Sequence, residues 1–207
     1  MMGKKLLALL LCGALLVTVL AACGAPEEKE VSAEQDSQPV ETEKEPDTGD
    51  ASLDNPRNQD GIGEKELLVV SFGTSYNDSR RLTIGAIENA MEEAFPEYAV
   101  RRGFTSQIII DHVKSRDNVA IDNVKQALDR AVENGVKTLV IQPTHLMDGL
   151  EYHELVDEVA QYSDAFEHLA IGKPLLTSEA DFQAVEQAIT EATAEYDDGK
   201  TAICFMG

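Results

Sequence analysis

The sequence from residue 65 onward predicts an α/β fold, a three-layer sandwich whose central sheet is parallel. The run ELLVVSFG, residues 66–73, is apolar over most of its length, as expected of a parallel strand covered on both faces. Further short apolar runs follow, and they alternate with segments whose apolar residues have helical spacing. This alternation is typical of strand–helix–strand units, which pair their strands in parallel.

Five strands are expected in this part of the chain. Each is a short apolar run, and several end at a glycine or a polar loop; the run over residues 98–104 is the weakest. The closing run, TAICFMG, ends at Gly207 and is interpreted as the fifth strand. The predicted strands cover residues 66–73, 98–104, 137–145, 168–176 and 201–207.

Four helices are expected between these strands. The first is capped by Asn77 or Asp78 and closed by Pro96, and the second covers residues 122–134 before an Asn-Gly pair. Residues 155, 159 and 162 mark the third. Ser178 and Asp181 resemble a capping box that opens the fourth.

The N-terminal residues do not resemble any part of a globular fold. Residues 1–22 have two lysines, an apolar stretch and then small residues, which is the pattern of a secretory signal peptide. The segment ends in Leu-Ala-Ala-Cys, which resembles the bacterial lipobox, so Cys23 is expected to carry lipid. A plain signal peptide with a chance cysteine is the alternative. We therefore expect an extracytoplasmic lipoprotein anchored to the membrane through its N-terminal lipid.

Residues 23–64 are rich in Glu, Asp, Pro, Ser and Thr and contain few aliphatic residues. Such a segment is predicted to be a disordered acidic tether, because it can bury little apolar surface. It contributes much of the net charge of −21, which argues against nucleic acid as a partner. Only Cys204 would remain as a free thiol in the mature chain, so no disulfide within the chain and no paired-cysteine metal site are expected.

Ligands of such sheets bind outside the carboxyl ends of the strands, and two loops there are of interest. The first, SFGTSYNDS, is rich in hydroxyl groups and could hold an anionic group before a helix, although it lacks both common nucleotide-binding patterns. The second, over residues 142–155, contains His145, Glu151 and His153, which could bind a divalent metal or move protons. The alternatives are that His145 is an ordinary hydrogen-bonded loop residue and that Glu151 interacts only with the helix dipole.

Taken together, these stretches resemble the anaerobic cobalt chelatases of cobalamin synthesis, the sirohydrochlorin cobaltochelatases. The matching segments follow the order of that family and extend over essentially everything after residue 64. They include LLVVSFGTSYNDSRRLTIGAIE, FPEYAVRRGFTSQIII, DNVKQALDRAVENG, VIQPTHLMDGLEYHEL, IGKPLLTSEADF and FMG.

The resemblance implies two similar α/β domains with a tetrapyrrole cleft between them, and insertion of Co²⁺ into sirohydrochlorin without ATP. Co²⁺ would be a substrate, with Fe²⁺ or Ni²⁺ as possible metals and no tightly bound cofactor. Residues 65–197 would form the first domain, and residues 198–207 the first strand of a second.

The resemblance also implies where the main metal ligands lie. In the family they follow Phe-Met-Gly and belong to the later domain, which here places them after Gly207. No metal ligand is therefore expected in this chain, which would be inactive by itself.

The cleft-lining residues are indicated by the same resemblance. Glu151 is expected to assist catalysis electrostatically or by handling protons, and His145 is a second catalytic candidate. Substrate binding is assigned to Ser71, Phe72, Gly73, Thr74 and Ser75. A different class of function remains open, that of a surface-anchored module that binds a tetrapyrrole or metal and relays it without catalysis.

Overall fold

The computed structural model describes residues 46–204, and they contain a four-stranded parallel sheet with the strand order β2-β1-β3-β4. The α/β fold predicted from the sequence is therefore confirmed. β1 is central, and Leu67 aligns with Val100 of β2 on one side and with Val140 of β3 on the other. The strands are β1 (Lys65–Ser71), β2 (Ala99–Phe104), β3 (Thr138–Pro143) and β4 (His168–Ile171).

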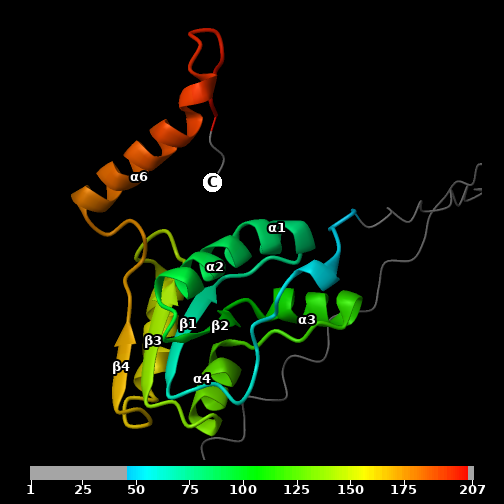
Figure 1. Ribbon diagram of the computed structural model, residues 1–207, viewed down its shortest axis with the longest axis vertical. Coiled ribbons are helices and arrows are strands. Elements are labelled where there is room, and N and C mark those ends of the chain that lie inside the picture. Colours follow the sequence, from blue (N-terminus) through cyan, green and yellow to red (C-terminus); the bar gives the residue numbers. More distant parts are fainter. Residues whose placement is uncertain (1–45, 205–207) are drawn as a thin grey trace, which may run out of the picture. The chain divides into compact units, whose positions relative to one another are not determined.

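Helices cover both faces of the sheet (Figure 1). Leu68 of β1 packs with Leu128 of α4 and Leu155 of α5 on one face, whereas Val69 packs beside Met91 of α2 on the other. Successive apolar side chains of β1 therefore enter two different cores, one on each face of the sheet. The helices are α1 (Asn77–Leu82), α2 (Ile84–Ala94), α3 (Gln107–Asp117), α4 (Val124–Glu133), α5 (Leu150–Ala160) and α6 (Glu179–Thr193), with short 3-10 turns η1 (Ala51–Leu53) and η2 (Ala194–Tyr196).

The first helical region differs from its prediction, because one expected helix is two. α1 ends and α2 begins at Thr83, whose hydroxyl donates a 2.7 Å hydrogen bond to the carbonyl of Ser79. A threonine that bonds back to the preceding turn competes with regular helix geometry. Neither Asn77 nor Asp78 caps this helix, since the cap position is Tyr76 and Asn77 is buried.

α3 was not predicted, and its composition explains why. Ile108, Ile109 and Ile110 are consecutive, which resembles a strand more than a helix face. Only Ile110 and Val113 of this helix are buried, beside Phe104 at the end of β2. The predicted capping box of α6 is confirmed, because the Ser178 side chain and the N3 residue Asp181 bond each other's backbone.

The C-terminal part of the described chain is more open than predicted. β4 ends at Ile171 rather than at residue 176, and Lys173-Pro174 follows, where proline cannot donate to a strand ladder. α6 has no buried residue.

The fifth strand, predicted to run from residue 201 to Gly207, is not formed where the structure describes it. Residues 201–204 are exposed and have no strand conformation, since none of the described strands lies beside them to share hydrogen bonds. An apolar run needs such a neighbour to become a strand, so its sequence alone was not a sufficient basis for the prediction. Residues 205–207, including Gly207, lie outside the described part.

Residues 46–64, which we call the strap, were predicted to belong to the disordered tether, and this prediction is wrong for them. Arg57 is 3% exposed, and its main-chain carbonyl accepts a hydrogen bond from the amide of Arg102 on the edge strand β2. The Asp54 carboxylate lies 2.6 Å from Arg80 and 2.7 Å from Arg102. Charged residues that look solvated in the sequence are here buried as ion pairs. The predicted signal peptide, Cys23 and the tether up to residue 45 lie outside the described residues.

Candidate functional site

The loops at the carboxyl end of the sheet are joined to one another by main-chain hydrogen bonds. The amide of Thr105 donates to Ser71, and that of Thr144 donates to Val70, at 2.9 and 2.8 Å. Farther along, the amide of Leu175 donates to His145 at 2.9 Å. The four loops that follow β1, β2, β3 and β4 therefore form one continuous edge, which we call the site edge.

The loop after β1 contains the five residues assigned to substrate binding. The Ser71 hydroxyl is buried and accepts a 2.8 Å hydrogen bond from the Thr144 hydroxyl. Gly73 has φ +102°, and a Cβ atom there would lie 2.5 Å from the Phe104 ring, so only glycine fits this position. Phe72 is half exposed, whereas Thr74 and Ser75 are partly buried.

Two arginines hold this loop through its carbonyl groups. Arg80 donates to the carbonyl of Thr74 at 3.2 Å, and Arg116 donates to that of Ser75 at 2.6 Å. The carboxylate of Asp54, in the strap, orients Arg80 from behind. Burial alone would raise the pKa of Asp54, but the guanidinium groups of Arg102 and Arg80 outweigh it and lower that pKa. The loop is thus held by charges that lie outside the site edge.

His145 and Glu151, the two catalytic candidates, lie together in the structure. His145 Nε2 is 3.8 Å from a carboxylate oxygen of Glu151, and their side chains are 8% and 49% exposed. Burial lowers the pKa of His145, while the Glu151 charge opposes the shift. α5 begins at Leu150, so Glu151 lies in its first turn, as expected. The next imidazole, His153, lies 3.0 Å from Asp148, and both side chains are well exposed.

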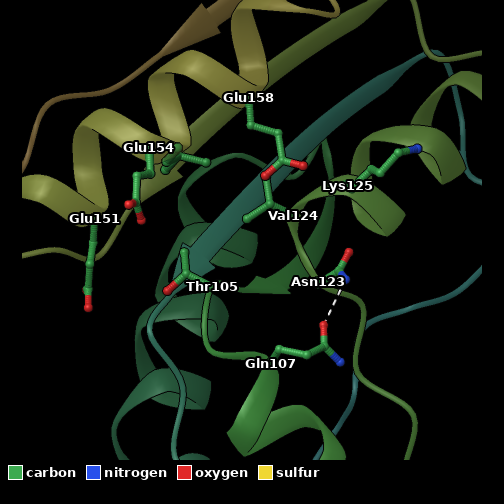
Figure 2. A pocket seen from close by; sticks show the side chains of 9 residues that line it. Thr105, Gln107, Asn123, Val124, Lys125, Glu151, Glu154 and Glu158 are labelled. Carbon is green, nitrogen blue, oxygen red and sulfur yellow. Dashed lines mark hydrogen bonds between the residues drawn. The ribbon is translucent and has the colours of Figure 1, made fainter. Parts of the chain in front are cut away.

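A polar cavity of about 340 Å³ opens beside Glu151 (Figure 2). Three carboxylates of α5 reach it, and Lys125 and the hydrogen-bonded pair Gln107–Asn123 lie across from them. Burial raises the pKa of one of these carboxylates, Glu158. The cavity is lined by Thr105, Gln107, Asn123, Val124, Lys125, Glu151, Glu154, Leu155 and Glu158. Among them, only Glu151 was predicted from the sequence as a site residue, because the way α5 faces the loop after β2 and the start of α4 is defined only by the fold.

Large apolar side chains are exposed along the same edge, and sequence analysis identified only one of them, Phe72. They occur in the loops or first helical turns after all four strands, where an apolar residue has no core to fill. Their positions just after predicted strands are the signal that could have found them. They are Phe72, Tyr76, Ile108, Leu146, Met147, Leu150 and Leu175, between 48% and 83% exposed.

Neither a closed metal centre nor a membrane span is present within residues 46–204. No group of three or more His, Cys, Asp or Glu side chains there is arranged to hold a metal ion. None of the helices in this part of the chain is long and apolar enough to cross a membrane. Cys204 is a free, exposed thiol. The metal ligands expected after Gly207 fall beyond the described residues, so their placement stays a prediction.

Comparison with known proteins identifies the family of this chain. The chain is 38% identical over 128 residues to the sirohydrochlorin cobaltochelatase of Salmonella typhimurium, an alignment that covers 62% of this chain and 48% of that protein. It is 28% identical over 160 residues to the sirohydrochlorin cobaltochelatase CbiKC of Nitratidesulfovibrio vulgaris, covering 75% of this chain and 56% of the relative. The chain therefore spans about half the length of these curated relatives. Residues 65–207, well over half of the chain, match the family described as cobalt chelatase (CbiK), and the chain belongs to that family.

Proposed function

We propose that this chain forms one wall of a sirohydrochlorin cobaltochelatase, which inserts Co²⁺ into a tetrapyrrole without ATP during cobalamin synthesis. The observation that carries the proposal is the composition of the site edge. Exposed apolar side chains occur in the segments after all four strands, and the same edge carries an imidazole–carboxylate pair, His145 and Glu151. A flat macrocycle offers large apolar faces, and its pyrrole nitrogens must exchange two protons for a metal ion. The site edge is suited to both requirements.

In this proposal the protein contributes binding, positioning and proton transfer. The loop over residues 71–75 holds the macrocycle, and its conformation is maintained by Gly73 and by the arginines beneath it. The solvent-facing carboxylate of Glu151 accepts pyrrole protons or stabilises the charge that develops as they leave. A second α/β domain completes the cleft and supplies further metal ligands. The curated relatives, which are about twice as long as the matched part, are consistent with such a partner.

Titration with sirohydrochlorin, followed by cobalt insertion, tests the proposal. The absorbance spectrum of the macrocycle reports both binding and metallation. We expect the chain to bind sirohydrochlorin, and we expect metallation only when a second domain is also present. Absence of any macrocycle binding would contradict the proposal. Binding without metallation in the presence of a second domain would favour the relay function instead.

A matched pair of variants tests the role of Glu151 in the same assay. Glu151→Gln is expected to lower the insertion rate by about 10²-fold, the usual lower bound for a residue that transfers protons. Glu167→Gln removes another exposed carboxylate, at the opposite end of the sheet, and should leave the rate unchanged. Equal rates in the two variants would remove Glu151 from the site.

We further propose that the chain is anchored outside the cytoplasm through a lipid on Cys23. The signal-like residues 1–22 and the lipobox-like Leu-Ala-Ala-Cys support this proposal. Cys23→Ser should abolish incorporation of a labelled fatty acid and release the chain from the membrane fraction. Cys204→Ser is the control, and it should change neither result. Labelling that survives in Cys23→Ser would contradict the anchor.

A further inference from the structure

The imidazole of His145 has no hydrogen-bond partner within the described residues. Neither Nδ1 nor Nε2 is bonded, both atoms are fully buried, and the side chain is 8% exposed. A buried polar group without a partner destabilises the fold, so most such groups in folded proteins are paired. An imidazole in this condition, at the end of a strand where ligands of parallel sheets bind, indicates a partner that arrives from outside the chain.

The position of Glu151 indicates what kind of partner this is. Its carboxylate oxygen lies 3.8 Å from His145 Nε2, which is too far for a hydrogen bond. Two ligands on a tetrahedral metal ion with bonds of about 2.0–2.1 Å lie roughly 3.3 Å apart. The observed separation is therefore near that of two ligands on one ion. Glu151 is half exposed in the first turn of α5, and a small side-chain rotation closes the remaining difference.

We propose that His145 and Glu151 together bind a divalent transition-metal cation and hold it for transfer. An imidazole nitrogen and a carboxylate oxygen suit Co²⁺ and its neighbours in the first transition row. No third metal-ligating side chain completes the set within residues 46–204, so water would fill the other positions. An ion with open positions can pass to a new ligand, whereas the fully closed sites of structural metals retain their ion.

The surroundings of the pair favour a cation. Glu154 and Glu158 line the cavity beside Glu151, so three carboxylates face a single lysine, Lys125, and an excess of negative charge concentrates cations. The nearby His153–Asp148 pair does not receive the same assignment. Its atoms are already 3.0 Å apart, and the side chains are 63% and 57% exposed, so neither group lacks a partner or access to water.

Titration of the full chain with Co²⁺ alone tests this proposal. The visible absorbance of Co²⁺ reports its coordination, and calorimetry gives affinity and stoichiometry. We expect one Co²⁺ per chain, with affinity reduced about tenfold or more in His145→Phe and in Glu151→Gln. His168→Phe, which removes an exposed imidazole at the opposite end of the sheet, is the matched control and should bind as the parent does. Affinity that is unchanged in His145→Phe would overturn the proposal.

If a variant does not fold, proton NMR of the unsubstituted chain can still identify the histidine that binds Co²⁺. Co²⁺ is paramagnetic, so the imidazole signals of His145 should broaden or shift first, before those of His153 and His168. Broadening that begins at His153 would overturn the assignment.

Only the later destination of the ion depends on the proposed function. Bound Co²⁺ with no binding of sirohydrochlorin would contradict the chelatase and leave the metal pair standing. Sirohydrochlorin binding with no Co²⁺ at His145 would contradict the metal pair alone.

Discussion

Buried charged groups beneath the strap contrast with the buried imidazole at the site edge. Arg102 lies 2.6 Å from Glu88 and 2.7 Å from Asp54, and Arg80 bonds Asp54, Asn77 and a loop carbonyl. The imidazole of His145, by comparison, has no hydrogen bond within the described residues. The charged groups of the first region are paired with one another. The second leaves a polar group unsatisfied, as expected where a ligand binds.

Asp54→Ala should break the strap region and have the largest effect. It would leave two buried guanidinium groups short of a partner, which typically costs about 3–5 kcal/mol of unfolding free energy. Urea unfolding followed by circular dichroism measures this loss. Asp60→Ala, which removes an exposed carboxylate of the strap paired with Arg130, should cost below about 1 kcal/mol. Similar losses in the two variants would contradict the distinction between buried and exposed pairs.

The sequence predicted the sheet and several site residues because they depend on local pattern. The apolar run over residues 66–73 and the capping box at Ser178 are such patterns. The strap could not be predicted, because its stability comes from pairs such as Asp54 with Arg102, which are distant in sequence. The lack of a hydrogen-bond partner for the His145 imidazole could not be predicted either, because it depends on which groups the fold places around the ring.

Glu66, a buried carboxyl group of β1, should make the stability of the fold depend on pH. Burial raises its pKa to about 7, although Arg101 opposes the shift. The folded state thus holds a proton that the unfolded state releases near pH 4.5. Unfolding free energy should fall by up to about 1.4 kcal/mol per pH unit as pH rises from about 4.5 to 7. Urea unfolding across this range should lose that slope in Glu66→Gln, and a persisting slope would exclude Glu66 as its source.

Gly73→Ala should distort the site edge at a smaller cost. The positive φ and the approach to Phe104 predict a loss of about 1–3 kcal/mol, together with weaker sirohydrochlorin binding. Gly135→Ala has a similar φ of +72° with no neighbouring atom within 4 Å, so it isolates the strain from the clash. Thermal unfolding and macrocycle titration of both variants make the comparison. Equal macrocycle binding by the two variants would show that the loop after β1 does not contact the substrate.

His145→Phe should have the smallest effect on stability. Unlike the substitutions above, it should not lower the unfolding free energy. Replacing an imidazole that has no bonded partner with an apolar ring should leave unfolding free energy unchanged or raise it by about 1 kcal/mol. Tyr162→Phe is the contrasting change, because it removes a 2.6 Å hydrogen bond to Asp129 and should lower stability by about 1 kcal/mol. A marked loss in His145→Phe would show that the imidazole stabilises the fold.

The strap also limits where a strand of another chain can pair with this sheet. An outermost strand normally presents unpaired amides and carbonyls, which invite pairing with a foreign strand and aggregation. Along β2 the strap occupies these groups, since Arg57 accepts from the amide of Arg102 and Gln59 donates to the carbonyl of Val100. At the other end of the sheet, β4 pairs only with β3 among the described strands. A strand added from another domain or molecule therefore has one side of the sheet on which to join, beside residues 168–171.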